Sequence, residues 1–587
     1  MPSFLAFLPT FLATASALPG LSFGPAQSVG GEWQALPGLY SPQSASSFGS
    51  ATSILPDLDG DGFAEVLVGA AAASPGSLTG AGAAYLYHGG DGVLLHEWHG
   101  SQAHGRFGSA VCGIADLNGD AIPDLLIGAP GEDRSNLSSA GAVYCMSGAD
   151  YSQLHVYRGN FANDLSGTSI ASAGDIDGDG YADFLLGGPG RSPTGMPSAG
   201  EVRLISGKTW HTTLYFRGDY LGGRLGSTVL GVGDQNADGI PDLLMAAPLA
   251  NPNSVSVAGQ VRLHSGADGQ LLQEWHGSTQ SARLGTALAS ADLNDDLIAD
   301  LILGAPGAVG AVGTAVAGKA GVGEVQFVHG GTLQLQWTQP GTQEYGFFGD
   351  ALGTSIGSGV DGWQAINPTS GMDGLPGAEI LVGAPGEDAA ALVNVGSIYL
   401  LDAATAEITA HLVGNHHDAS LGKQVSAVGD WDGVVGGELM VAVPEPGAGQ
   451  PVLQFWGWHP YLKLSDQQIS ASAGGSFFAQ LDFPISEAGQ PVRLLASAAG
   501  PGSTHWQGVD IPLIADGLTQ LSLYGNHLWT PQSVQLNAAA QKTVRLSFPA
   551  DALSPWIGQQ IRLAAITHQG LGTPRLSSAA AALIVSH

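Results

Sequence analysis

A nine-residue acidic segment that returns at a nearly constant interval constrains the fold of this chain more than any other feature of its sequence. The copy at residues 175–183 reads DIDGDGYAD, and similar copies begin at Asp57, Asp116, Asp234 and Asp292. An apolar run that ends in small residues and a proline follows most copies, as in LLIGAP at residues 125–130. A segment that recurs in one fixed context indicates a repeated supersecondary unit.

Seven units are marked by the Phe-Gly or Leu-Gly pair that opens each of them. The pairs, the third of which is interrupted by a serine, are Phe48-Gly49, Phe107-Gly108, Leu165-Ser166-Gly167, Leu225-Gly226, Leu284-Gly285, Phe348-Gly349 and Leu421-Gly422. Each unit contains short runs of β-branched and aromatic residues between glycine-rich turns, which are typical of four antiparallel strands. Four strands repeated seven times predict a β-propeller, with a linear solenoid as the main alternative.

The two ends of the repeat favour a closed ring. Residues 31–34 (GEWQ) resemble the fourth strand of a unit, such as residues 97–99 (EWH), and they precede the first Phe-Gly pair. The seventh unit ends after its third strand, near Trp458. We therefore expect the amino-terminal strand to complete the last blade, which would remove the exposed sheet edges of an open array.

On these motifs, residues 30–458 resemble the FG-GAP repeats of integrin α subunits and their bacterial relatives. The resemblance covers about three quarters of the chain and implies a seven-bladed β-propeller. It also implies that the acidic loops bind calcium and that partners bind the opposite, calcium-free face. In that family the propeller serves recognition or scaffolding more often than catalysis.

The acidic segments themselves also indicate calcium ligands. Oxygen side chains at positions 1, 3 and 5 of such a loop can converge on one point, and glycine at position 6 permits a sharp reversal. A backbone carbonyl at position 7 and a carboxylate at position 9 complete the shell. Hard oxygen ligands in this number suit Ca²⁺ better than Zn²⁺ or a thiophilic metal. The alternative is a plain Asx turn without metal.

Five copies keep the full set of oxygen ligands. The predicted ligands, with the apolar residues contributing backbone carbonyls, are Asp57, Asp59, Asp61, Phe63 and Glu65; Asp116, Asn118, Asp120, Ile122 and Asp124; Asp175, Asp177, Asp179, Tyr181 and Asp183; Asp234, Asn236, Asp238, Ile240 and Asp242; and Asp292, Asn294, Asp296, Leu297 and Asp300. We expect weaker binding in the first loop, where Glu65 is one methylene longer than aspartate. The fifth loop should also be weaker, because Leu297 replaces the glycine.

The sixth and seventh units carry degenerate acidic segments. In the sixth, an insertion separates Asp361 from residues 373–379, and in the seventh, Asp430 and Asp432 lack a third ligand before Glu438. We expect neither segment to bind metal.

Charge and hydropathy narrow the possible partners. Asp and Glu number 50 against 18 Lys and Arg, which gives a formal charge of -32. Such a chain repels nucleic acid and anionic lipid surfaces, so we expect no nucleic-acid partner.

Residues 1–17 have the apolar run and small-residue cleavage site of a secretory signal, although a short buried strand or helix is the alternative. We interpret residues 18–29 as a leader segment. No later apolar run is long enough to span a membrane. We therefore expect the protein to be secreted or at the cell surface.

The calcium-free face is where we expect an unknown protein or glycan ligand, because it carries the longer loops. Four acidic residues in these loops either receive a basic partner or keep the rim soluble: Glu132, Asp133, Glu387 and Asp388.

The tripeptide Arg217-Gly218-Asp219 falls where other units have a strand end, so we interpret it as a chance sequence. Two strand spacings separate Cys112 from Cys145, which is too far for a disulfide.

Residues 460–587 lack the repeat and alternate strand-like runs with turns, which predicts a β-sandwich. The whole chain is thus predicted to be all-β, with a seven-bladed FG-GAP β-propeller followed by a smaller β-sandwich. The 17 histidines are scattered and no catalytic arrangement stands out, so we predict a binding, adhesion or surface-structure protein rather than an enzyme. The alternative is a carbohydrate-active enzyme, a polysaccharide lyase or hydrolase, built on a calcium-stabilised propeller.

Overall fold

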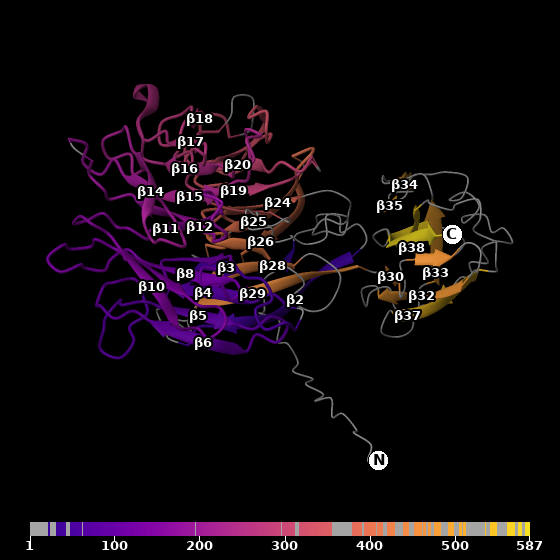
Figure 1. Ribbon diagram of the computed structural model, residues 1–587. Coiled ribbons are helices and arrows are strands. Elements are labelled where there is room, and N and C mark those ends of the chain that lie inside the picture. The colour runs from indigo at the N-terminus through magenta and orange to yellow at the C-terminus, as the bar shows by residue number, and fades with distance from the viewer. Residues whose placement is uncertain are drawn as a thin grey trace, which may run out of the picture.

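The computed structural model describes most of the region predicted to form the propeller, together with strands of the carboxy-terminal region (Figure 1). The described residues are 22–23, 31–42, 47–61, 63–193, 195–294, 296–310, 316–354, 379–389, 392–406, 408–414, 420–428, 438–444 and 451–460, followed by strands between 462 and 586. The predicted signal at residues 1–17 lies outside them, as do the acidic residues of the sixth and seventh units up to residues 378 and 437.

The described chain is all-β, and its one helix is the 3₁₀ turn η1 (Pro252–Ser254). Among the residues that the structure describes, six antiparallel sheets have four strands each. In chain order, five of them are β3 (Phe48–Ile54), β4 (Val66–Ala70), β5 (Ala83–Tyr87) and β6 (Leu94–His99); β7 (Ala110–Ile114), β8 (Asp124–Ala129), β9 (Ala142–Met146) and β10 (Gln153–Arg158); β11 (Ser169–Gly174), β12 (Asp183–Gly188), β13 (Glu201–Ile205) and β14 (Thr212–Arg217); β15 (Thr228–Gly231), β16 (Leu243–Ala247), β17 (Gln260–His264) and β18 (Leu271–His276); and β19 (Leu288–Ala291), β20 (Asp300–Ala305), β21 (Glu324–Val328) and β22 (Leu335–Pro340).

The sixth four-stranded sheet is built from both ends of the repeat region. It contains β27 (Val425–Val428), β28 (Glu438–Pro444), β29 (Pro451–Pro460) and β2 (Gly31–Tyr40). β2 pairs antiparallel with β29 from Gly31 opposite Pro460 to Tyr40 opposite Val452. The prediction that the amino-terminal strand completes the last sheet is therefore confirmed.

One further sheet of the repeat region has five strands. Four of them are β23 (Ala351–Thr354), β24 (Glu379–Ala384), β25 (Ser397–Asp402) and β26 (Ile408–Val413), in the same antiparallel order as elsewhere. The fifth is β1 (Ser22–Phe23), from the predicted leader segment, which pairs with β26. Sequence analysis did not predict this additional strand.

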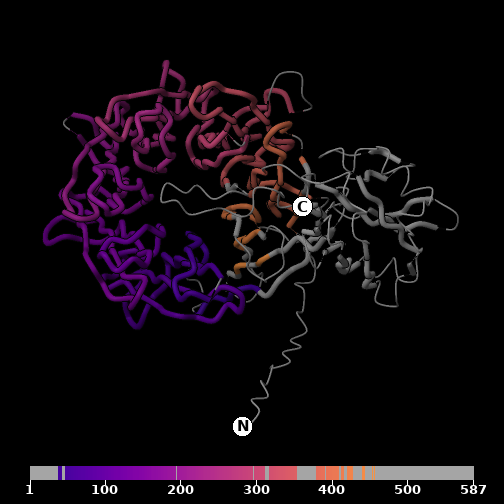
Figure 2. Tube along the Cα trace, turned by 45° about the vertical axis from the view of Figure 1, so that its right-hand side comes forward, coloured from indigo at the N-terminus to yellow at the C-terminus, as the bar shows by residue number. Residues whose placement is uncertain are grey.

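The sheets form a β-propeller. The first strands of successive sheets contact one another in the order β3, β7, β11, β15, β19, β23 and β27, and β27 in turn contacts β3. Figure 2 follows the described chain around this ring, from indigo to orange. A linear solenoid would leave β27 and β3 far apart, so that alternative is excluded.

Apolar side chains fill the spaces between neighbouring sheets. Phe48 and Tyr85 from the first sheet pack in one buried cluster with Met440, Leu453 and Phe455 from the last. The ring is thus closed by a hydrophobic core as well as by the β2–β29 hydrogen bonds.

The Phe-Gly pairs owe their sequence to the junctions between sheets. Phe107 forms a parallel bridge with Gly82 of the preceding sheet. Gly108 has a φ of +83°, and a Cβ on it would lie 2.1 Å from the Ala83 carbonyl oxygen. Only glycine fits such a position, because it tolerates the left-handed conformation and leaves room for the neighbouring backbone.

Cys112 on β7 and Cys145 on β9 both lie opposite Leu126 of the intervening strand β8. Neither forms a disulfide, as the strand spacing predicted.

The carboxy-terminal region is also made of strands. One sheet has three, β30 (Leu462–Leu464), β32 (Gly475–Asp482) and β37 (Gln541–Phe548). Another contains β31 (Gln468–Ser470), β40 (Ala581–Ser586), β38 (Gln560–Gln569), β33 (Pro491–Ser497) and β36 (Val534–Gln535), with β39 (Thr573–Ser577) paired to β38, and the last is a hairpin of β34 (Thr504–Trp506) and β35 (Val509–Ile511). The β-sandwich remains a prediction.

Candidate metal centres

The five complete acidic segments all connect the first strand of a sheet to its second. The loop at residues 57–65 lies between β3 and β4, and the loop at 175–183 lies between β11 and β12. Because strands alternate in direction within each sheet, these loops share one face of the propeller. We call them loops one to five in chain order.

Within each loop, backbone N–H groups hold the acidic side chains in a common arrangement, which loop three illustrates. Asp175 accepts hydrogen bonds from the Asp179 N–H (3.0 Å) and the Gly180 N–H (2.9 Å). Asp179 in turn accepts one from the Tyr181 N–H (3.0 Å). As a result Asp175, Asp177 and Asp179 each offer one carboxylate oxygen, and these oxygens lie within 4.8 Å of one another.

The carboxylate at position 9 has a different environment, because it is buried where the second strand begins. Asp183 accepts the Ile176 N–H (3.1 Å) with one oxygen and the Gly207 N–H (3.0 Å) with the other. Asp124, Asp242 and Asp300 make the same pair of contacts in their loops. In these four loops the aspartate at position 9 therefore connects the loop to the turn after the third strand.

Burial disfavours the ionised form of these carboxylates and so raises their pKa. Desolvation raises the pKa of Asp124, Asp183 and Asp242 to about 6, although the backbone N–H donors oppose the shift. Desolvation also raises the pKa of Glu65 in loop one to about 7. A divalent cation beside such groups would favour their ionised forms.

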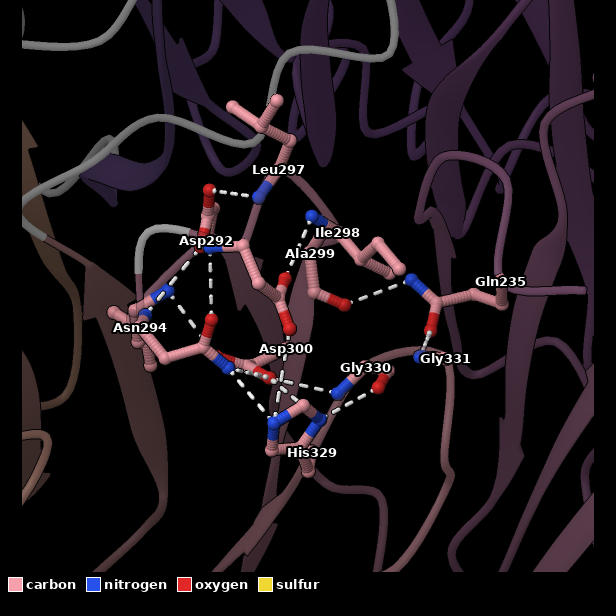
Figure 3. Close-up of polar contacts among 12 residues, drawn as sticks. Gln235, Asp292, Asn294, Leu297, Ile298, Ala299, Asp300, His329, Gly330 and Gly331 are labelled. Atoms are coloured by element: carbon pink, nitrogen blue, oxygen red, sulfur yellow. Dashed lines mark hydrogen bonds and ion pairs between the residues drawn. The ribbon is translucent and has the colours of Figure 1, made fainter. Parts of the chain in front are cut away.

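Loop five differs from the sequence prediction in the residue that occupies position 7 (Figure 3). The Ile298 N–H donates to Asp296 (2.9 Å), as the Tyr181 N–H does to Asp179. Leu297 occupies position 6, donates its N–H to Asp292 (2.7 Å) and has a side chain that is 93% exposed. Ile298 rather than Leu297 therefore occupies position 7, the position from which the loop motif would supply a carbonyl ligand. Leu297 has a φ of +69°, which shows that the loop keeps its reversal without glycine.

Two histidines that the sequence analysis did not single out lie beside loops one and five. His88 Nε2 is 2.8 Å from Asp61 Oδ2 in loop one, and His329 Nε2 is 3.1 Å from Asn294 Nδ2 in loop five (Figure 3). Both residues directly follow a third strand, where the other three loops have serines, Ser147, Ser206 and Ser265. A column-by-column comparison of the repeats would have shown this substitution.

On the opposite face, two of the four predicted contact residues are not at the surface. Glu132 is 1% exposed and accepts hydrogen bonds from the Tyr144 hydroxyl (2.8 Å) and Arg158 (3.0 Å). Glu387 is equally buried and accepts one from the Tyr399 hydroxyl (2.6 Å). Buried side chains neither meet an outside partner nor keep a rim soluble, so neither of the two alternatives for Glu132 and Glu387 fits the structure.

The other two side chains hold their own loops. Asp133 is exposed and accepts the Ser139 N–H (2.8 Å), and Asp388 likewise accepts the Asn394 N–H (2.7 Å).

The tripeptide 217–219 is part of the sheet framework. Arg217 ends β14 and donates to Glu201 (3.4 Å), and Asp219 accepts a hydrogen bond from Arg262. This agrees with its interpretation as a strand end.

Comparison with known proteins adds to this geometry. The model of the FG-GAP repeat family matches residues 48–87, 107–145 and 166–205. This protein contains FG-GAP repeats. Each matched FG-GAP segment begins at or within an opening Phe-Gly or Leu-Ser-Gly motif and ends in the third strand of the same sheet.

Parts of this chain are similar to parts of larger proteins. A phosphatidylinositol-glycan-specific phospholipase D of Bos taurus is 32% identical over 208 residues, which are 32% of this chain and 23% of that protein. Integrin alpha-M of Mus musculus is 38% identical over 102 residues, which are 16% of this chain and 8% of the integrin. The chain thus matches less than a quarter of either relative's length.

A solved structure of BBS1N in complex with ARL6DN, soaked with lead, aligns with 73% of this chain at a TM-score of 0.41 and 9% identity.

The described residues of this protein contain no helix with the length and hydropathy required to cross a bilayer.

Proposed function

We propose that this protein is a secreted, calcium-stabilised FG-GAP propeller that acts in binding, adhesion or surface structure rather than in catalysis. The observation that carries the proposal is the repeated geometry of the acidic loops, in which backbone N–H groups orient the carboxylates and the carboxylate at position 9 is buried. Oxygen ligands held in this way suit Ca²⁺, which takes six to eight oxygen ligands. Bound Ca²⁺ would also offset part of the formal charge of -32.

We further propose that the ring has seven blades. The five-stranded sheet contains the same four antiparallel strands as its neighbours, and its first strand β23 contacts β19 on one side and β27 on the other. Counting it as the sixth blade accounts for all seven opening motifs. The carboxy-terminal sheets would then form a separate β-sandwich.

The relatives support a role outside the cell without fixing the activity. Their names include an enzyme, the phospholipase D, as well as integrin subunits. The similarity covers less than a quarter of the Bos taurus phospholipase, so we do not transfer its activity. We infer that the partner, a protein or a glycan, binds the calcium-free face.

Calcium titration of the chelator-treated protein tests the proposal. Calorimetry should find about five Ca²⁺ sites, or four if loop one prefers another metal. The melting temperature should rise with Ca²⁺, because a ligand at 100 times its Kd stabilises the folded state by about 2.7 kcal/mol per site. As a matched test, Asp175→Asn and Asp179→Asn should each remove one site, whereas Asp150→Asn, outside the loops, should remove none. A melting temperature that does not respond to Ca²⁺ would contradict the proposal.

A further inference from the structure

His88 brings a nitrogen ligand to loop one. It follows β5, whose last residue Tyr87 pairs with Val66 at the start of β4, so its ring lies beside the loop. Its Nε2 atom is 2.8 Å from Asp61 Oδ2 and 3.7 Å from Asp59 Oδ2. Asp59, Asp61, Glu65 and His88 each offer one ligand atom, and these four atoms all lie within 4.8 Å of one another.

Glu65 contributes a buried carboxylate oxygen that has no hydrogen-bond partner. Its side chain is fully buried, and Oε2 accepts the Leu58 N–H (2.7 Å). Oε1 is also buried and has no hydrogen-bond partner. In loop two, by contrast, both oxygens of Asp124 accept backbone N–H groups. A buried carboxylate oxygen without a partner costs folding free energy, and a bound cation would remove that cost.

The other ring nitrogen of His88 is already held by a carboxylate. Nδ1 lies 2.8 Å from Asp91 Oδ1, and the same oxygen accepts the Val93 N–H (3.0 Å). When Nδ1 donates its proton to Asp91, Nε2 faces the loop, and a metal ion there would take the place of the Nε2 proton that bonds to Asp61. A carboxylate that orients a histidine in this way is the usual outer partner of a metal-bound imidazole.

We propose that loop one binds a divalent transition-metal ion, Zn²⁺ in the simplest case, through Asp59, Asp61, Glu65 and His88. Imidazole nitrogen with carboxylate oxygens is a ligand set for zinc-like ions, whereas Ca²⁺ takes oxygen only. The position 1 carboxylate Asp57 lies outside this set, and its Oδ1 accepts the Gly60 and Asp61 N–H groups. The proposal rests on the proposed function for the other loops, since it assigns loop one a different metal from theirs.

Loop five shows that a histidine alone does not make the same site (Figure 3). His329 Nδ1 donates to the Gly330 carbonyl (2.6 Å) rather than to a carboxylate. Both oxygens of Asp300 accept backbone N–H groups, and position 3 is Asn294 rather than aspartate. The proposal is therefore confined to loop one.

Loop four supplies the matched variant. Ser265 occupies the place of His88, and its hydroxyl donates to Asp238 Oδ2 (3.4 Å). His88→Ser thus gives loop one the side chain that an oxygen-only loop has at this position. Asp91→Asn keeps the histidine but weakens its orientation, and His99→Ser, on β6 away from the loop, serves as the control.

The test is calorimetric titration of the full chain with Zn²⁺ after chelator treatment and saturation with Ca²⁺. The wild type should bind one Zn²⁺ ion tightly, and that event should weaken about tenfold or more in His88→Ser and in Asp91→Asn. His99→Ser should bind like the wild type, and the number of Ca²⁺ sites in the other loops should not change. Bound Co²⁺ should show a visible absorption spectrum that His88→Ser alters.

Two results separate this proposal from the proposed function. Zn²⁺ binding that is absent, or that is the same in His88→Ser as in the wild type, would overturn the transition-metal site and leave calcium binding by loops two to five intact. Zn²⁺ binding that depends on His88 supports the site even if the other loops fail to bind Ca²⁺, which would overturn the proposed function alone.

Discussion

At the scale of single residues, one amide side chain joins two neighbouring acidic loops. Gln235 occupies position 2 of loop four, where the other loops have leucine or isoleucine. It donates to the Ala299 carbonyl (2.7 Å) and accepts the Gly331 N–H (3.2 Å), both in the next unit (Figure 3). The remaining loops make this connection with apolar side chains, since Ile176 lies against Gly266 of the next sheet.

Replacing Gln235 by alanine should destabilise the protein by about 1–3 kcal/mol, because buried backbone groups lose their partners. Urea unfolding of Gln235→Ala measures the change in free energy. Gln270→Ala, whose side chain is exposed, is the control and should be nearly neutral. Equal stability of the two variants would show that the amide does not join the loops.

A half-buried histidine should make stability depend on pH. His411 stacks on Tyr399 with ring centroids 4.2 Å apart, and burial lowers the pKa of His411. Tyr399 donates its hydroxyl to Glu387, the acidic group of this cluster, and burial raises the pKa of Glu387. Because the folded pKa lies below the unfolded value of about 6.5, the unfolded state binds the proton more readily, and stability is lost as the pH falls below that value.

His411→Phe removes the titrating ring while keeping an aromatic partner for Tyr399. The urea midpoint should therefore fall less between pH 7 and pH 5 in this variant than in the wild type. An identical fall in both proteins would contradict the assignment.

At the scale of secondary-structure elements, the opening Phe-Gly pair packs against the backbone of the preceding sheet, as Phe107 does through its bridge to Gly82. Gly108→Ala should cost more than about 2 kcal/mol, because the new Cβ meets backbone atoms in addition to adopting a positive φ. Gly195 is a matched control, since its φ is +78° and a Cβ there would have nothing within 4 Å. Gly195→Ala should cost about 1 kcal/mol. Thermal unfolding of both variants measures the difference.

Sequence was sufficient for those features that depend on local spacing. The period and the strand-like runs predicted the four-stranded sheets, and the GEWQ segment predicted which strand completes the last of them. Side-chain contacts between distant parts of one unit were not predictable in the same way. The loop position of Glu132 predicts exposure, but its carboxylate bonds to Tyr144 and Arg158 from strands of its own sheet and is buried. His88 was missed because its partners lie 23 to 29 residues earlier in the chain.

At the scale of the whole molecule, β2 determines whether the ring is closed. Deleting residues 31–40 should lower the melting temperature of the whole propeller, because the last sheet loses a strand and the buried Leu39. Deleting residues 22–23 removes only the additional strand β1 and is the matched control. A melting temperature that responds equally to both deletions would show that β2 has no special role.

The pairing of β2 with β29 also fixes the order of events during biosynthesis. The first of these strands leaves the ribosome early, whereas its partner at residues 451–460 emerges only after every other sheet of the toroid has been translated. Residues 31–40 of the nascent chain therefore lack their partner strand β29 throughout that interval. Any export machinery that handles the chain before then meets a propeller whose ring is still open.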